Sequence, residues 1–170
     1  QPVDVREDAY DSTEYIRVNV IGTLNVLEYC RRSGIDDVIC TISHRGVQGL
    51  WNKGEVITEE ATKALKYTGD YTMFSISECA ASDCVWHYAA KYGLRGVVLR
   101  LPLVFGYGPH AEGYRDGKPV KAGFSVFIER AMKGQTIELW GDVELARDIV
   151  YVKDVVSAVI LALKNKEASG

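Results

Sequence analysis

The chain has 170 residues, about the size of one domain, and 47% of them are apolar, which is enough to form a core. Charged residues make up 25% and the formal net charge is -3, which disfavours a nucleic-acid-binding protein, because such proteins usually have a basic face. Because no apolar run is long enough to span a membrane and no secretory leader is visible, we expect a cytoplasmic protein with neither a membrane nor a nucleic-acid partner.

Hydrophobic periodicity, with glycine at the stops, divides the chain into alternating helices and strands. The segments with helical periodicity are 12–33, 74–92, 124–133 and 152–164. The short apolar runs typical of buried strands are 37–42, 95–101 and 136–140. The glycine-containing segments that we expect to be loops are 43–60 and 102–123. A loop as long as the second of these is usually functional.

This order of elements predicts an α/β fold with a mostly parallel sheet and helices on both faces. No internal repeat and no shift in composition marks a second domain. Sheets of this kind bind ligands at the carboxyl ends of their strands, which here are Ser43-His44, 102–108 and the segment around Arg147. The turn Gly106-Tyr-Gly108 lacks the third glycine and the following helix of a dinucleotide-binding loop, so we interpret its glycines as turn formers.

Four segments carry longer motifs: Asn19-Val-Ile-Gly-Thr in the first helix, Val38 to Gly49, Tyr92 to Pro109, and Gly134 to Asp154 with its Arg147-Asp-Ile-Val-Tyr-Val-Lys-Asp. In this order and spacing they resemble the extended short-chain dehydrogenase/reductase family of NAD-dependent nucleotide-sugar epimerases and dehydratases. The resemblance covers nearly the whole chain. It implies a Rossmann-like, mostly parallel sheet that is incomplete, because the N-terminal glycine-rich βαβ unit and the C-terminal end of the family's domain are absent.

The resemblance also implies what the whole protein would do. Residues 1–170 would be the central-to-late part of one NAD(P)-binding domain, with substrate-lobe elements at about 105–147. The parent would bind NAD or NADP and a nucleotide sugar, and would transiently oxidise a sugar hydroxyl before epimerisation or elimination. We expect no cofactor on this chain alone, no metal, and a homodimer through the helices at about 12–33 and 74–92. The sequence does not specify the sugar, the base, or NAD against NADP.

The catalytic positions of that family are not matched. In the family a tyrosine is the acid/base, a lysine four residues later lowers its pKa, and a serine or threonine holds the reacting oxygen. Counting back from Tyr92-Gly-Leu94 places Phe74 at the tyrosine and Glu78 at the lysine, and counting back from Gly49 places His44 at the serine or threonine. Because a free tyrosine titrates at about 10, the family needs a cation beside it, and Glu78 has the opposite charge.

Other site positions follow from the same resemblance. The cofactor-binding positions are Ser43, Glu78, Pro102 and Val104. The substrate-binding positions are Tyr107, Arg147 and Leu103, the last of which is an asparagine in the family. Arg147 suits a diphosphate by its bidentate geometry and equally suits an ion pair with Asp148 or Asp154. Ser43 and Tyr71 are further candidate catalytic positions. No lysine lies between Lys66 and Lys91, so a shift of the register onto Tyr71 does not restore the tyrosine–lysine pair.

Three interpretations of these mismatches remain open. In the first, the hydride-transfer site has decayed, leaving a nucleotide-binding or dimeric scaffold protein. Alternatively, His44 replaces the tyrosine as acid/base, with its pKa raised by Glu78, because histidine titrates near neutrality without a neighbouring cation. In the third interpretation these catalytic positions are misaligned, or the parent is an active epimerase or dehydratase with atypical residues. The chain by itself is predicted to be inactive in all three.

Overall fold

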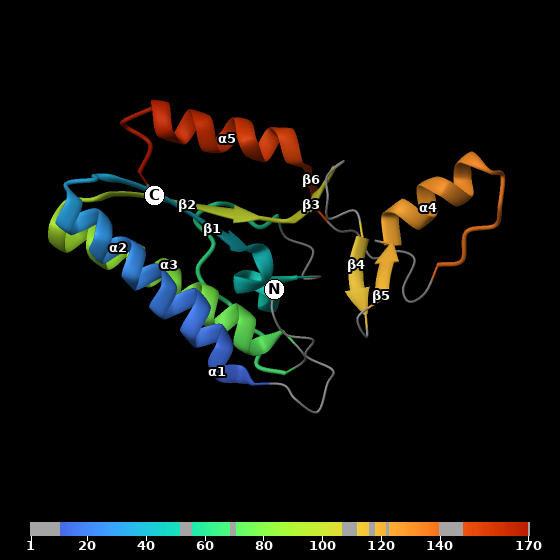
Figure 1. Ribbon diagram of the computed structural model, residues 1–170, viewed down its shortest axis with the longest axis horizontal. Helices are drawn as coiled ribbons and strands as arrows, with labels where there is room; N and C mark the ends of the chain where they lie inside the picture. The colour runs from blue at the N-terminus through green and yellow to red at the C-terminus, as the bar shows by residue number, and fades with distance from the viewer. Residues whose placement is uncertain are drawn as a thin grey trace. The chain divides into compact units, whose positions relative to one another are not determined.

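The computed structural model describes residues 11–51, 56–68, 71–106, 112–115, 118–121, 123–139 and 148–169 (Figure 1). For residues 112–115 and 118–120 it describes the backbone alone. The chain forms two compact units, which are described separately. The first contains the residues up to Pro102 together with those from Ser157 onward, and the second runs from Leu103 to Val156.

The first unit begins with one long helix, as the periodicity over 12–33 predicts. It consists of α1 (Ser12–Tyr15), a π-helical segment η1 (Ile16–Ile21) and α2 (Gly22–Ser33). The Asp11 side chain caps its start by accepting a hydrogen bond from the Thr13 N–H at 2.8 Å. Gly34 ends it at a φ of 67°, a left-handed conformation that favours glycine. The π-helical segment departs from the predicted α-helix, and such segments are frequent at functional sites.

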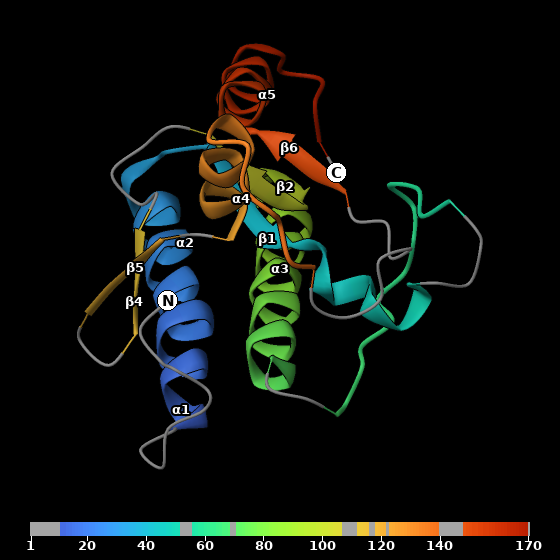
Figure 2. The same cartoon turned by 90° about the vertical axis from the view of Figure 1, so that its right-hand side faces the viewer.

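Two parallel strands form the centre of this unit. β1 (Asp37–Ser43) pairs with β2 (Arg95–Leu101) in a register that runs from Asp37 beside Arg95 to Ser43 beside Leu101. The crossover between them contains α3 (Thr72–Tyr92). α2 and α3 lie side by side on one face of the strands, and the later half of α5 (Val152–Lys164) lies on the other (Figure 1, Figure 2). The predicted fold class is therefore confirmed.

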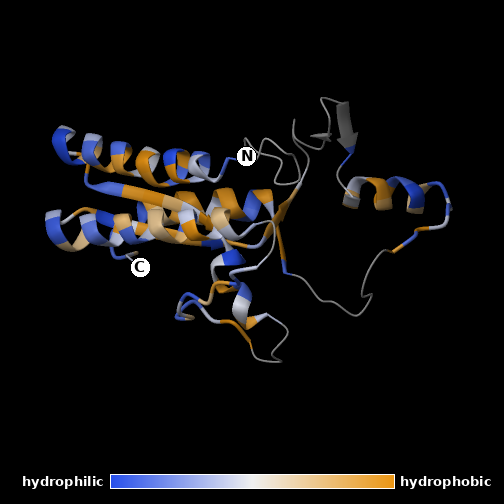
Figure 3. Cartoon of the chain, turned by 90° about the horizontal axis from the view of Figure 1, so that it is seen from below, coloured by the Kyte–Doolittle hydropathy of each residue, from blue (hydrophilic) through white to orange (hydrophobic). Residues whose placement is uncertain are grey.

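The core of the first unit lies between its helices and strands. Leu27 of α2 and Val85 of α3 are each only 1% exposed. Three buried serines of α3 donate their hydroxyls to backbone carbonyls three or four residues earlier, so burial leaves none of them unsatisfied: Ser75, Ser77 and Ser82. The strand that runs between α2 and α3 in Figure 3 is coloured mostly hydrophobic. All the buried residues of α3 are small or medium-sized, which allows its neighbours to pack closely against it.

Substituting Gly96 by alanine is expected to destabilise the chain by about 2 kcal/mol, because the added methyl group has no room. A Cβ on Gly96 would lie 2.7 Å from Cγ1 of the buried Val85. Urea denaturation followed by circular dichroism measures the change. Gly22→Ala is the matched control, since its nearest neighbour, the Arg17 carbonyl oxygen, would be 3.9 Å away and alanine favours a helix. Equal midpoints for the two variants would contradict the prediction.

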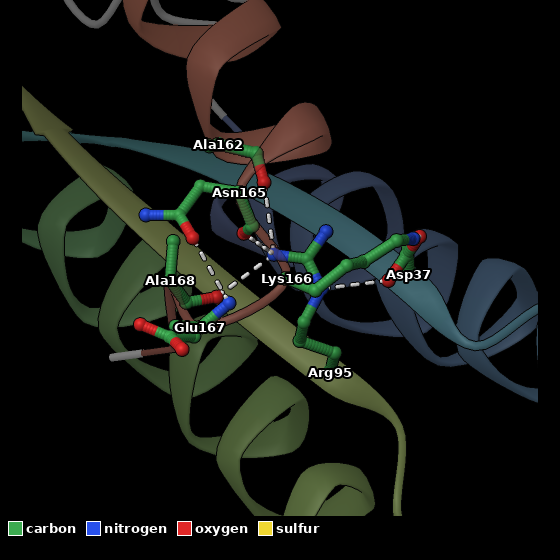
Figure 4. A network of polar contacts seen from close by, with 7 residues as sticks. All are labelled: Asp37, Arg95, Ala162, Asn165, Lys166, Glu167 and Ala168. Atoms are coloured by element: carbon green, nitrogen blue, oxygen red, sulfur yellow. Dashed lines mark hydrogen bonds and ion pairs between the residues drawn. The ribbon is translucent and has the colours of Figure 1, made fainter.

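Arg95, at the start of β2, joins both strands to the end of α5 (Figure 4). Its Nε donates to Asp37 Oδ1 at 2.7 Å, directly across the β1–β2 register. Its Nη1 donates to the carbonyls of Ala162 at 2.8 Å, Asn165 at 3.1 Å and Ala168 at 2.8 Å, so two N–H groups are shared among three acceptors. These carbonyls belong to the last turn of α5 and the residues after it, where helix carbonyls lack intrahelical partners and a cation is favoured.

Asp37 is held by a second cation as well. Lys166 contacts its other carboxylate oxygen, Oδ2. The hydrogen bonds from Arg95 and then Lys166 lower the pKa of Asp37 to about 2. Nη2 of Arg95 is buried and has no hydrogen-bond partner among the described residues. The side chain of Arg95 is therefore fixed by its other two nitrogens, and the segment after α5 is attached to the sheet through it.

The second unit is smaller and less regular. β3 (Leu103–Phe105) pairs in parallel with β6 (Ile149–Tyr151), and β4 (Glu112–Arg115) pairs antiparallel with β5 (Lys118–Lys121). α4 (Gly123–Met132) follows, close to the predicted helix at 124–133. α5 begins directly after β6 and passes into the first unit.

Two predictions for this unit are wrong. The segment 102–123, predicted to be a loop, contains β3, β4 and β5. Asp116-Gly117, between β4 and β5, is a dipeptide typical of hairpin turns, and the glycine content of the segment concealed that signal. The predicted strand at 136–140 is not a strand over the described residues 136–139, which are exposed and have no β partner there. A short apolar alternation without a neighbouring strand does not form a ladder.

Candidate functional site

The carboxyl ends of β1 and β2 lie side by side and place His44 against β2. His44 begins the 3₁₀-helical segment η2 (His44–Leu50), which replaces the first part of the predicted loop at 43–60. Its Nδ1 lies 3.2 Å from the Leu101 carbonyl oxygen, and its ring stacks on Trp51 with centroids 4.8 Å apart. A carbonyl only accepts, so Nδ1 is the protonated nitrogen of the neutral ring and Nε2 has the lone pair.

Glu78 of α3 reaches the same strand end. Its Oε2 accepts a hydrogen bond from the Ser43 N–H at 2.9 Å. Burial raises the pKa of Glu78, while the Ser43 N–H and the charge of Arg45 act in the opposite direction. The sequence places Glu78 and His44 at one site, and the structure brings both to Ser43. The hypothesis that Glu78 raises the pKa of His44 stays a prediction.

Phe74 lies one helical turn before Glu78, next to the first helix. Its ring meets Tyr15 edge-on with centroids 6.1 Å apart. Asn19, on the π-helical segment η1, donates from Nδ2 to Ser77 Oγ at 2.9 Å, and Ser77 in turn donates to the Phe74 carbonyl at 2.8 Å. The Asn19 side chain thus joins the first helix to α3. In the structure this side chain therefore has a role in helix packing.

Sequence reasoning did not single out Arg45, the residue after His44. Its guanidinium carbon lies 4.0 Å from the centroid of the Tyr71 ring and 5.9 Å from that of Trp51. The backbone N–H of Arg45 donates a hydrogen bond to Ser43 Oγ at 3.2 Å, which fixes the backbone at the start of η2. The reversed charge at Glu78 was the signal that could have prompted a search for a compensating cation nearby. Tyr71, predicted as a nearby tyrosine, packs its ring face against this cation.

Replacing Glu78 by glutamine is expected to raise the melting temperature at pH 8 and to change it little below about pH 4, where a free glutamate is protonated. Burial raises the pKa of Glu78 in the folded chain. At a pH between the unfolded and the folded pKa, the folded chain therefore keeps a proton that the unfolded chain has released. Stability of the wild type therefore falls as the pH rises from the unfolded pKa through the folded one. Glutamine has no charge to bury and keeps an oxygen for the Ser43 N–H.

Thermal unfolding at pH 4 and pH 8 measures this dependence. Glu59→Gln is a suitable control, because Glu59 is exposed and its removal leaves the strand end unaltered. A difference between Glu78→Gln and wild type that is the same at both pH values would show that the buried charge is not its cause.

The remaining predicted positions differ in their location. Pro102 is half-buried and directly follows β2, next to Leu101, whose carbonyl His44 contacts. Leu103, 53% exposed, and Val104, 38% exposed, belong to β3 of the second unit. Tyr107 and Arg147 lie outside the described residues. Within the described parts of the chain, no cluster of histidine, cysteine, aspartate or glutamate is suited to a metal ion, and no helix is long and apolar enough to cross a membrane.

The chain belongs to the NAD dependent epimerase/dehydratase family, whose model matches residues 3–170. It is 30% identical over 150 residues to a putative UDP-glucose 4-epimerase of Methanocaldococcus jannaschii, in a match that covers 88% of this chain and 45% of that protein. The extended short-chain dehydrogenase/reductase family, expected from four motifs, is confirmed.

Solved structures agree with this assignment. The UDP-glucose 4-epimerase of Thermus thermophilus, in complex with NAD, is 29% identical with a TM-score of 0.68, over 91% of this chain and 47% of that one. The UDP-glucose 4-epimerase of Thermotoga maritima, with UDP-glucose, is 26% identical with a TM-score of 0.73, over 96% of this chain and 49% of that one. The chain therefore spans less than half the length of these relatives.

Proposed function

We propose that the protein containing this chain binds NAD or NADP and a nucleotide sugar, but lacks the tyrosine–lysine proton transfer of its family and serves as a nucleotide-binding or dimeric scaffold protein. The observation that carries this proposal is the pair Phe74 and Glu78. A phenyl ring has no proton to exchange. A half-buried carboxyl group, bound to the Ser43 N–H, cannot supply the positive charge that lowers the pKa of a tyrosine.

A nicotinamide dinucleotide fits these residues only in part. The Glu78 carboxylate can accept a hydrogen bond from a ribose hydroxyl, although its Oε2 already accepts one from Ser43. The positive charge that the family places at this position is missing. No proton-transfer step involving the cofactor follows from Phe74 and Glu78. We propose the same division of the chain as the family has, with residues 1–170 in one NAD(P)-binding domain and substrate-lobe elements at about 105–147.

The full-length protein tests the proposal directly. Absorbance of the purified protein shows whether nicotinamide cofactor is bound, and chromatography shows whether UDP-, GDP- or dTDP-sugars are converted. Bound cofactor without turnover is the expected result. Turnover by the wild type would contradict the loss of catalysis, and absence of both cofactor and nucleotide-sugar binding would contradict the proposed ligands.

His44 supports a second candidate, an active enzyme in which this histidine is the acid/base. The observation in its favour is the hydrogen bond of Nδ1 to the Leu101 carbonyl, which leaves the basic nitrogen of the ring on the side away from β2. Turnover that is abolished in His44→Ala would support this candidate, and turnover that survives would exclude it. His87→Ala is the matched control, because His87 is exposed on α3, away from the strand end.

We also propose that the protein forms a homodimer through the helices at 12–33 and 74–92. Large apolar side chains are exposed on the first helix, with Tyr29 65% exposed and Val26 56% exposed. Light scattering of the full-length protein measures its mass. Val26→Glu is expected to shift a dimer to a monomer, because a carboxylate at an apolar interface must be desolvated without a partner.

A further inference from the structure

Arg45 differs from the other arginines of the molecule. Every other arginine whose side chain is described donates to a carboxylate or a carbonyl: Arg17 to Glu14, Arg31 and Arg32 to Glu28, Arg95 to Asp37, Arg100 to Ala61, and Arg130 to Thr136. Among the described residues, the guanidinium of Arg45 has ring contacts but no hydrogen-bond or ion-pair partner. The five N–H donors of this guanidinium therefore have no acceptor among the described residues and can serve a bound ligand.

The side chain of Arg45 is also held in place. Tyr71 lies against its guanidinium, and Trp51, which follows the residue's own 3₁₀ segment, lies farther away. Stacking on a ring uses the flat face of a guanidinium and leaves its edge available for the two parallel hydrogen bonds that a carboxylate or phosphate accepts. Because the side chain is half-buried and already ordered, little conformational entropy is lost when an anion binds.

Arg45 places a positive charge at the carboxyl end of β1. It follows His44 at the carboxyl end of β1, the end of a parallel sheet at which ligands bind. Glu78 is the nearby anion, and its carboxylate accepts the Ser43 N–H. A nearby cation favours the binding of an anionic ligand beside a carboxylate. The charge of Arg45 acts on Glu78 at this strand end. The guanidinium of Arg100, near the end of β2, instead donates to the Ala61 carbonyl.

We propose that Arg45 binds an oxyanion of the ligand, a carboxylate or a phosphate, at the carboxyl end of β1. This inference rests on the proposed binding of a nucleotide sugar. It adds a residue that selects for ligands with a negative charge at this point. The two sources of such a charge are a carboxylate on the sugar and the diphosphate that joins the sugar to the nucleoside.

Calorimetric titration of the full-length protein with UDP-glucuronate and UDP-glucose separates these sources. Both ligands have the diphosphate, and only UDP-glucuronate has the sugar carboxylate. Arg45→Gln is expected to weaken binding about tenfold or more, and Arg45→Lys to weaken it less, because lysine keeps the charge but not the flat bidentate edge. Arg32→Gln, which removes an exposed arginine of α2, is the control and is expected to bind as wild type does.

Each outcome has one meaning. Loss of affinity for UDP-glucuronate alone assigns Arg45 to a sugar carboxylate, and equal loss for both ligands assigns it to the diphosphate. Unchanged affinity for both in a folded Arg45→Gln variant, checked by circular dichroism, overturns the inference.

If the wild type binds neither nucleotide sugar, the proposed function fails, and a direct probe then tests Arg45 alone. Inorganic phosphate and glucuronate are titrated while tryptophan fluorescence is followed, with Trp51→Phe identifying the part of the signal that comes from Trp51. A change that is present in wild type and absent in Arg45→Gln supports an oxyanion site without a nucleotide. No change in wild type overturns it.

Discussion

Replacing Arg95 by methionine is expected to destabilise the chain by about 3 kcal/mol, because one side chain satisfies a carboxylate and three carbonyls. Methionine fills much of the same space but donates nothing. Asp37 would lose its hydrogen bond at 2.7 Å, and the carbonyls of Ala162, Asn165 and Ala168 would lose their shared donor. The residues after α5 would detach from β2, since Lys166 alone would then link them to Asp37.

Urea denaturation measures the change in the free energy of unfolding, and limited proteolysis after residue 164 measures detachment of the end. Arg17→Met is the matched control. Arg17 forms an ion pair with Glu14 on an exposed helix surface, where such pairs contribute little, so its loss is expected to change stability by about 0.5 kcal/mol or less. If Arg95→Met and Arg17→Met lower the free energy of unfolding by the same amount, the contacts of Arg95 do not hold the end of α5 in place.

The long helices and the strands of the first unit could be predicted from the sequence because each has its own local signal, whereas the 3₁₀ segment η2 and the π-helical segment η1 were not predicted. The helix at 12–33 and the strand at 95–101 are bounded by Gly34 and Gly93, which adopt left-handed φ values of 67° and 73°. The β4–β5 hairpin was missed because its strands are short and polar, so that its pairing depends on the turn and not on an apolar pattern. Strand pairing is a non-local property, and periodicity does not specify a partner.

The candidate site was predicted in part, for a similar reason. Family spacing placed His44, Phe74 and Glu78 together, and the structure has all three in the first unit, with Glu78 bonded to the residue before His44. The stacking of Arg45 on Tyr71 joins residues 26 positions apart, so nothing in a single stretch of sequence indicates it. The cation that accompanies the reversed charge at Glu78 could be found only from the three-dimensional arrangement.

Restoring the family pair with Phe74→Tyr and Glu78→Lys in the full-length protein is expected to raise conversion of a nucleotide sugar by about 100-fold or more, the contribution of a positioned acid/base. Residues four apart on a helix share a face, so the new lysine would lie beside the new tyrosine and lower its pKa. The double variant loses the hydrogen bond that Glu78 accepts from the Ser43 N–H, and the introduced lysine is repelled by Arg45. Both effects are expected to destabilise the fold. Interconversion of UDP-glucose and UDP-galactose, followed by chromatography, measures the gain.

The single variants show whether the pair acts as a unit. Phe74→Tyr alone would place a tyrosine beside the Glu78 carboxylate, whose negative charge raises a tyrosine pKa, so its gain is expected to be far smaller than that of the double variant. Glu78→Lys alone supplies a cation with no proton donor and is expected to be inactive. A double variant that binds NAD and UDP-glucose yet stays as slow as wild type would mean that the loss of catalysis lies outside these two residues. Equal gains from Phe74→Tyr and the double variant would mean that the charge at position 78 does not control the tyrosine.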